Sequence, residues 1–302
     1  MKVISPITVT NAILTASNVT ENDHSEWDIS TTYDADDYVI VIGTTHKIYQ
    51  SAQGSNLGND PTTDDGTWWT EISATNRWKA FDQKIADQVS KSGTITYSIT
   101  PASIVTGIGF LGLSAAEVRV QVYDTNPTEI YDETVNLIDD SGIVSWFTYF
   151  TFDAADYDTE ALFVDIPAYA GYQIDITIGD GTGTAKVGQI IPGKVQTLGE
   201  QIDGTSIGIE DFSTKSRDDF GNAILVERAF ADEVSFRFVL QSSDARRVKR
   251  ILSDLRAVPA LYFADEEMIS YGATVYGFFK DFDIPLSSGG VSFANLEIEG
   301  LT

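Results

Sequence analysis

The sequence predicts a mainly β protein, with a small aromatic β module and a β-sandwich of the jelly-roll type followed by an α+β domain with one helix. Two observations predict the strands: short runs of Val, Ile, Thr and aromatic residues recur along the chain, and Gly, Asp, Asn and Ser interrupt them. A third observation predicts the helix, because one segment of the last third repeats its apolar residues at helical spacing.

Residues 1–75 are predicted to hold an N-terminal strand and the aromatic module. The module contains the apolar run Val39–Gly43, which predicts a strand, and its aromatic residues are separated by Asp, Asn, Gly and Thr. Five rings are candidate carbohydrate-binding residues: Trp27, Tyr33, Tyr49, Trp68 and Trp69. Flat rings with polar tips suit the apolar faces and hydroxyl rims of sugars. The same rings could instead fill the core of a unit too small to be stabilised by aliphatic burial alone.

Residues 76–194 are predicted to form the β-sandwich. Four segments alternate apolar and polar residues, so each should bury one face; they are 94–100, 117–123, 144–152 and 172–178. The run Gly179–Gly183 predicts a tight hairpin, since neither a Lys-Ser/Thr pair nor a helical pattern follows it as a phosphate loop would require.

Residues 195–302 are predicted to form the α+β domain. Its helix should run from about Asp244 to Arg256, with Ser242, Ser243 or Asp244 as the cap. Val248, Ile251, Leu252 and Leu255 define the apolar face, and the other faces carry the densest basic cluster of the chain. This basic cluster is either a solvated helix face or a contact with an acidic neighbouring subunit, because charge can steer assembly.

Composition excludes several classes of function. The net charge is −26, from 45 acidic and 19 basic residues. Such a surface repels nucleic acid and anionic membranes, so neither partner is expected. The absence of Cys removes disulfides, thiolate nucleophiles and Cys-ligated metals. No stretch is apolar enough to span a membrane, and the N-terminus lacks the apolar region of a signal peptide.

Catalytic chemistry is not expected. The two histidines, His24 and His46, are not accompanied by a Gly-x-Ser-x-Gly elbow. No cofactor and no metal ligands are assigned, although the Asp-rich turns at 34–37 and Asp180 are of a type that suits calcium. A glycan-degrading enzyme with paired carboxylates stays open as an alternative, since sequence does not reveal the separation of two carboxylates.

Two stretches resemble sugar-binding domains. The order of aromatic and small residues in the module resembles the small chitin-binding modules of secreted glycan hydrolases, and the residues that carry it are Trp27, Tyr33, Val39, Tyr49, Ser51, Pro61 and Trp68. Asp36-Asp37 departs from the Gly-Asp of that family. The run Asn76–Asp82 resembles the opening of galactose-binding-like (discoidin-type) jelly rolls, which implies that Phe81 is a core residue and that Asp82 makes a structural turn.

The last third resembles a tail protein of tailed bacteriophages. The segments that carry this resemblance are 190–193, 209–215, 219–222, 226–230, the helix 244–256, 276–282 and 292–301; the opening 5–19 is similar to the start of the same virion proteins.

This resemblance implies a structural protein of the tail tip or baseplate, assembled in the host cytoplasm and carried in the virion. It also implies a homo-oligomer whose partners are other tail proteins, with a C-terminal domain that docks onto the particle. Together with the module, it predicts carbohydrate-binding-like domains for attachment to a host-surface glycan. The alternative is a purely architectural tail or collar protein whose β modules make protein–protein contacts.

Overall fold

The computed structural model describes residues 1–302 except 139–143, 152–156, 218–219, 265–272, 286–289 and 302. The chain divides into two compact units, one made of 1–7, 105–108 and 191–302 and the other of 8–104 and 109–190. The predicted boundary at 194/195 falls inside one strand, Gln189–Thr197, and the N-terminal strand belongs to the same unit as the C-terminal third.

The first unit is built on an antiparallel sheet. In spatial order its strands are β16 (Gln189–Thr197, from Ile191 onward), β1 (Lys2–Pro6), β22 (Ala260–Phe263), β23 (Thr274–Asp283), β24 (Val291–Gly300), β21 (Phe230–Gln241) and β17 (Glu200–Gln201). β18 (Ser206–Asp211) also pairs with β21. The N-terminal strand β1 therefore lies inside the sheet, between β16 and β22.

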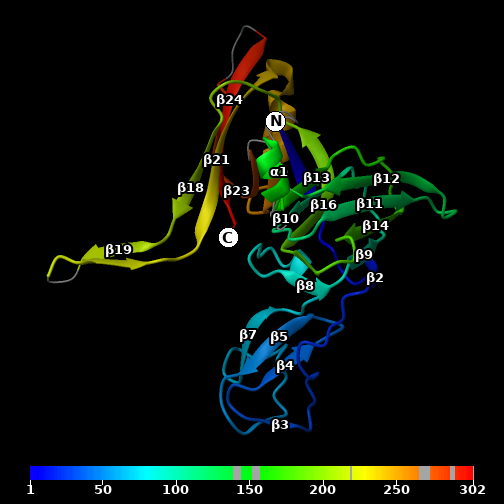
Figure 1. The fold of residues 1–302 in the computed structure, drawn as a ribbon, viewed down its shortest axis with the longest axis vertical. Coiled ribbons are helices and arrows are strands. Elements are labelled where there is room, and N and C mark those ends of the chain that lie inside the picture. The colour runs from blue at the N-terminus through cyan, green and yellow to red at the C-terminus, as the bar shows by residue number, and fades with distance from the viewer. Residues whose placement is uncertain (139–143, 152–156, 218–219, 265–272, 286–289, 302) are drawn as a thin grey trace. The chain divides into compact units, whose positions relative to one another are not determined.

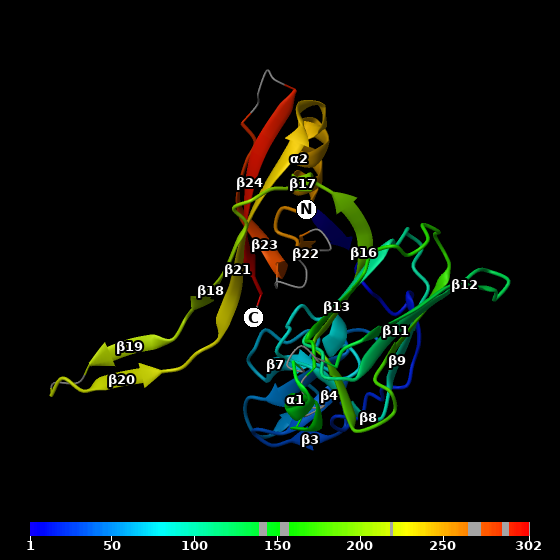
Figure 2. The same ribbon diagram turned by 45° about the horizontal axis from the view of Figure 1, so that its top comes forward.

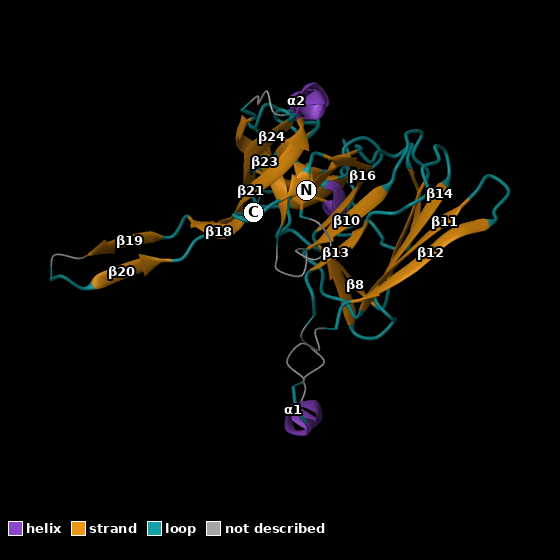
Figure 3. Cartoon of the chain, turned by 90° about the horizontal axis from the view of Figure 1, so that it is seen from above, coloured by secondary structure: helices purple, strands orange, loops and turns teal. Residues whose placement is uncertain are grey.

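One helix, α2 (Ala245–Asp254), packs on this sheet after the short 3-10 turn η2 (Ser242–Asp244). Figure 3 shows α2 beside the strands β23 and β24. Val248, Ile251 and Leu252 are buried against the core face of the sheet, where Phe236, Phe238 and Tyr262 are also buried. The helix predicted near 244–256 is confirmed, because its apolar spacing matches the face that the sheet needs covered.

A long arm precedes β21 in the first unit. It consists of β18 and the hairpin β19 (Thr214–Arg217) and β20 (Ala223–Val226). Figures 1 and 2 show the hairpin extending away from the strands of its own unit. Among the described strands, β19 and β20 pair with each other alone, from Thr214 opposite Val226 to Arg217 opposite Ala223. We call residues 206–230, without the two undescribed positions, the arm.

The second unit contains most of the segment 76–194, for which a sandwich was predicted, together with residues 8–75. Its larger sheet has the order β12 (Glu129–Asn136), β11 (Glu117–Tyr123), β14 (Gln173–Ile178), β9 (Ile95–Ile99) and β2 (Leu14–Ser17). Further strands are β10 (Gly107–Leu111), β13 (Glu160–Phe163), β8 (Val89–Ser92) and β15 (Thr184–Val187). Alternate residues such as Val118, Val120 and Ile176 are buried, as the period-two pattern predicts.

Two sequence predictions for the sandwich are wrong. The segment 144–152 is not a strand: α1 (Trp146–Thr151) is a short helix, and Phe152 lies outside the described residues. Ser145 and Thr148 explain this, because the Ser145 Oγ accepts the Thr148 backbone N–H at 3.2 Å, as a helix cap does. The run 179–183 is a turn but not a hairpin, since β14 pairs with β9 and β11 whereas β15 pairs with β8.

The aromatic module also lies in the second unit. A three-stranded sheet, β4 (Tyr38–Val41), β5 (Lys47–Ser51) and β7 (Trp69–Ala74), stands beside a short pair, β3 (Thr32–Tyr33) and β6 (Asn56–Leu57). The chain then enters the sandwich through the 3-10 turn η1 (Lys79–Phe81). The mainly β class with one substantial helix is therefore confirmed for the described part of the chain.

Candidate interaction surfaces

The five predicted sugar-binding rings form one cluster in the module. Tyr33, Tyr49 and Trp69 are buried, with exposed fractions of 8%, 6% and 2%. Trp27 and Trp68 are half-buried and pack against them. The structure thus brings all five residues together, but three of them offer almost no surface on which a sugar could stack.

Hydrogen bonds hold two of these rings, Trp69 and Tyr33, in place. The Trp69 Nε1–H donates to the Asn59 carbonyl at 2.9 Å, and the Asp28 backbone N–H donates to the Tyr33 hydroxyl at 2.8 Å. The rings of Tyr33 and Trp69 meet edge to face at 5.2 Å. Buried Trp and Tyr usually have such partners for their polar tips. Tyr33, Tyr49 and Trp69 are accordingly the core of the module, the alternative role that the sequence left open.

Exposed ring surface lies elsewhere in the second unit. Tyr38 is 40% exposed and stacks on His24 with a centroid distance of 5.0 Å. The short helix α1 exposes an uncharged aromatic cluster that comprises Trp146, Phe147, Tyr149 and Phe150. Sequence reasoning did not select these rings, because alternation predicted that one face of 144–152 would be buried.

A partly buried charged junction joins the module to the sandwich region. The Glu21 carboxylate accepts from the Thr75 hydroxyl at 2.8 Å, lies 2.7 Å from His46 Nδ1 and forms an ion pair of 3.2 Å with Arg77. The ring of His46 stacks on Trp78 at 4.5 Å. Both histidines are therefore engaged in aromatic packing, His24 with Tyr38 and His46 with Trp78, and His46 also contacts a carboxylate.

The carboxylates of the acidic turns accept backbone N–H groups of their own turns. The Asp37 carboxylate accepts the Asp34 backbone N–H at 2.7 Å, and the Asp180 carboxylate accepts the Thr182 N–H at 2.9 Å. Bonds to Thr182 also lower the pKa of Asp180. In the described residues no group of three or more His, Cys, Asp or Glu side chains is placed to hold a metal ion.

In the first unit, the arm exposes large apolar side chains. Those at least 40% exposed are Ile207, Ile209, Phe212, Phe220, Ile224, Leu225, Val226 and Phe230. The register places Ile207 opposite the buried Val234, so the apolar face of the main sheet continues onto the arm beyond its covered part. An exposed apolar patch of this kind is typical of a protein–protein contact.

The root of the arm is held by charge. The ammonium of Lys280 lies within 3.1–3.6 Å of carboxylate oxygens of Glu210, Glu233 and Glu299, which belong to three different strands. Hydrogen bonding to Glu233 raises the pKa of Lys280 and lowers that of Glu233. One lysine therefore ties β18 to the sheet.

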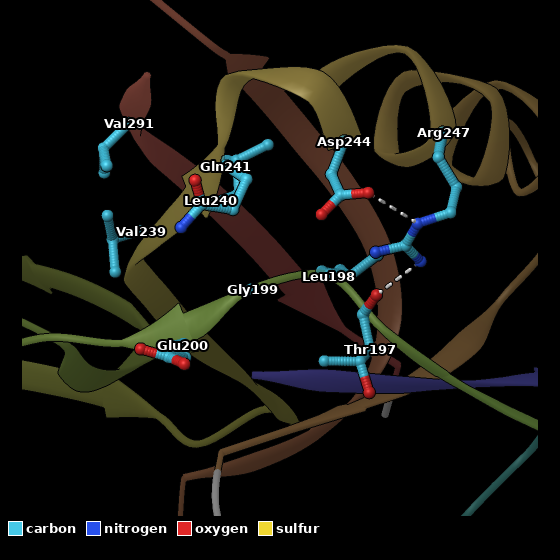
Figure 4. A pocket seen from close by; sticks show the side chains of 10 residues that line it. All are labelled: Thr197, Leu198, Gly199, Glu200, Val239, Leu240, Gln241, Asp244, Arg247 and Val291. Carbon is cyan, nitrogen blue, oxygen red and sulfur yellow. Dashed lines mark hydrogen bonds and ion pairs between the residues drawn. The ribbon is translucent and has the colours of Figure 1, made fainter. Parts of the chain in front are cut away.

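Helix α2 borders hollows of different character. One cavity, of about 350 Å³, is shown in Figure 4; there Arg247 forms an ion pair of 3.6 Å with Asp244 and donates to the Thr197 carbonyl at 2.9 Å. A second, of about 520 Å³, is lined by Ser242, Ala245, Arg246, Lys249, Phe282 and Ile284. We call this second hollow the α2 groove.

Among the helices of the described residues, none is long and apolar enough to cross a membrane.

No protein-family model and no curated protein matches the chain. Among solved structures, it is similar to a chain in the tail of an empty GTA particle, computed with helical refinement in C6 symmetry. The identity is 17%, the TM-score is 0.27, and the match covers 36% of this chain and 84% of that chain. A TM-score this low supports no argument about function, which has to come from the residues themselves.

Proposed function

We propose that the chain is a non-enzymatic structural subunit of a bacteriophage tail, and that its copies assemble through the arm. The observation that carries the proposal is the exposed apolar arm of the first unit. A two-stranded hairpin is marginally stable alone in water. The β19–β20 hairpin exposes every residue of its strands, among them Ile224, Leu225 and Val226. A neighbouring subunit would supply the missing apolar cover.

The open edge of the sheet supports the same function. β18 pairs with β21 on one side, and its other edge has no strand partner among the described residues. An uncovered strand edge is a template for pairing with another chain, and repeating subunits use such edges to close assemblies. The resemblance of segments 209–215, 226–230 and 276–282 to tail proteins supports a phage tail as the assembly.

The test removes the hairpin and keeps the sheet. Since Asp211 pairs with Phe230, residues 212–229 can be replaced by a two-residue Asn-Gly turn that joins β18 directly to β21. We expect this variant to stay folded by circular dichroism and to be monomeric by sedimentation velocity, whereas the full chain self-associates and enters particles. Self-association equal to that of the full chain would contradict the assembly role.

A second candidate function, attachment to a host glycan, is favoured by the exposed rings of the second unit. Trp27 and Trp68 keep part of their surface in the module, and several copies on one particle would strengthen a weak sugar site through avidity, by roughly 10²–10⁴-fold. Binding of the assembled particle to a glycan array tests this function. If the module binds sugar, W68A should lose the array signal. If α1 binds sugar, W146A should lose it. Unchanged binding in both variants would leave only the architectural role, and release of reducing ends would instead indicate an enzyme.

A further inference from the structure

We propose that the α2 groove receives the root of the arm of a second copy, with Phe212 entering the groove and Asp211 and Glu227 facing its cations. This inference rests on the proposed assembly function and names the surface that covers the arm.

The groove has an apolar floor. Phe282 and Ile284 are partly buried and pack at the margin of the core of the first unit, and Ala245 closes the helix side. The volume of about 520 Å³ lies within the range of roughly 300–1,000 Å³ that is usual for sites enclosing an organic group. A large apolar side chain fits such a space better than a small ion does.

The rim of the groove is cationic. Arg246 and Lys249 line it, and Arg250, four residues after Arg246, lies on the same face of α2 and lines the adjoining hollow. All three are exposed, and no ion pair is found for any of them within the described chain. Like charges at this spacing destabilise a helix, and an anionic partner would relieve that repulsion. Arg247 differs, because Asp244 and the Thr197 carbonyl already occupy it.

A further hollow adjoins the α2 groove on the side of its basic residues. It measures about 400 Å³ and is lined by Ser243, Arg246, Arg247 and Arg250. It shares Arg246 with the α2 groove, so an apolar slot and a cationic slot lie next to each other. The complementary ligand is a peptide segment in which an apolar side chain is flanked by carboxylates.

The arm carries such a segment. Phe212 is 41% exposed and is preceded by the exposed Asp211. Across the hairpin, the Phe212 N–H donates to the Ala229 carbonyl, which places the strand end that bears Glu227 on the neighbouring chain segment. The Asp211 carboxylate accepts the Ser213 backbone N–H at 2.9 Å and has a loose pair of 3.6 Å with Lys215, whose side chain is 71% exposed. A carboxylate has room for about four hydrogen bonds, so it can also meet a cation of a second copy.

A second copy is the occupant that charge favours. The chain has a net charge of −26, whereas α2 bears four basic residues and one acidic residue. The basic face of one copy is therefore attracted to the mostly acidic surface of another, and Asp211 and Glu227 are the carboxylates that flank Phe212 there. Because arm and groove are different surfaces, the contact is heterologous and can repeat from copy to copy.

Charge reversal tests the pairing in the full chain. We expect R246E/R250E and D211K/E227K each to weaken self-association by at least about tenfold, because a reversed charge would face a like charge across the contact. The chain that carries all four changes should recover wild-type self-association to within about threefold. R256E makes a matched change outside the groove and should behave as wild type. Circular dichroism checks that α2 is intact in every variant.

The outcomes separate the two proposals. If the hairpin replacement abolishes self-association but R246E/R250E does not weaken it, the groove is not the receptor and the assembly function stands. If both charge reversals weaken self-association and the variant with all four substitutions does not regain it, the proposed pairing of these residues is wrong. If the hairpin replacement itself has no effect, the assembly function fails, whatever the groove variants do.

Discussion

At the scale of single residues, Trp69 decides whether the module is a folded unit. Its side chain is 2% exposed, and it contacts Tyr33 and the Asn59 carbonyl. Trp69→Ala should destabilise the module by about 3–5 kcal/mol, the usual loss for truncating a buried aromatic residue. A thermal transition followed by fluorescence measures this. Leu57→Ala, at a surface position that is 55% exposed, should change little; equal losses in both variants would contradict the core assignment.

Asp82 predicts a dependence of stability on pH. Burial raises the pKa of Asp82 from 3.8 to about 6. The folded state binds the proton of the Asp82 carboxyl more tightly than the unfolded state does. The stability that this proton contributes to the folded state is therefore complete below pH 3.8 and is lost as the pH rises through about 6. Asp82→Asn keeps an acceptor for the Lys84 N–H and Gln189, and removes the ionisation. Relative to wild type, it should gain on the order of 1–2 kcal/mol between pH 4 and 7.5, allowing for its half-exposed position.

Asp132 supplies the opposite sign as a control. The hydrogen bond from Arg119 lowers the pKa of Asp132 and keeps it ionised. Its contribution is present above the unfolded pKa and disappears as the pH falls through the lowered value. Asp132→Asn should therefore lose stability relative to wild type as the pH rises. Chemical denaturation should show the change for Asp132→Asn at and below about pH 3.8 and the opposite change for Asp82→Asn between about pH 4 and 7.5. A stability difference between Asp82→Asn and wild type that stays constant over the higher range would refute the assignment for Asp82.

Individual rings also show what sequence could predict. The order of Trp27, Tyr33, Tyr49 and Trp68 identified a compact aromatic unit, and the structure clusters them. Burial was not predictable, since a small core and a sugar platform select the same residue types. The difference depends on neighbours such as Asn59, whose carbonyl becomes a partner only after the chain has folded back.

At the scale of elements, local signals succeeded where they agreed with packing. The spacing of Val248, Ile251 and Leu252 predicted a helix, and α2 forms there. The prediction was right because the sheet provides the apolar surface that this helix face covers. The alternation in 144–152 predicted a strand and failed, since a local cap at Ser145 and Thr148 favours helix and none of the residues of α1 is buried. Without packing, a local hydrogen bond decides the conformation.

The pairing of β18 with the sheet can be tested at Lys280. Lys280→Met would leave Glu210, Glu233 and Glu299 near one another without a cation. Amide hydrogens of β18 should then exchange roughly two- to fivefold faster, while those of α2 keep their rates. Lys215→Met, which removes one exposed pair with Asp211, is the matched control. Unchanged exchange in β18 would mean that backbone pairing with β21 alone holds the arm root.

At the scale of the whole molecule, chain order did not reveal which segments form each unit. The sequence grouped residues 1–75, yet β1 lies between β16 and β22, so its partners are more than 180 residues away along the chain. Strand signals give alternation but no partner, because many strands of similar composition can satisfy one edge. The insertion of the second unit between β1 and most of the first was invisible for that reason.

Deleting residues 1–6 tests this topology. Val3 and Ile4 are fully buried, β1 pairs on both edges, and the terminal amine of Met1 donates to the Gly199 carbonyl at 2.7 Å. Removing the strand would leave the edges of β16 and β22 open and empty part of the core. We expect the first unit to lose its cooperative unfolding transition in calorimetry, while the transition of the second unit remains. If the full chain and the deletion variant instead share both transitions, β1 is dispensable, and the sheet of the first unit must close without it.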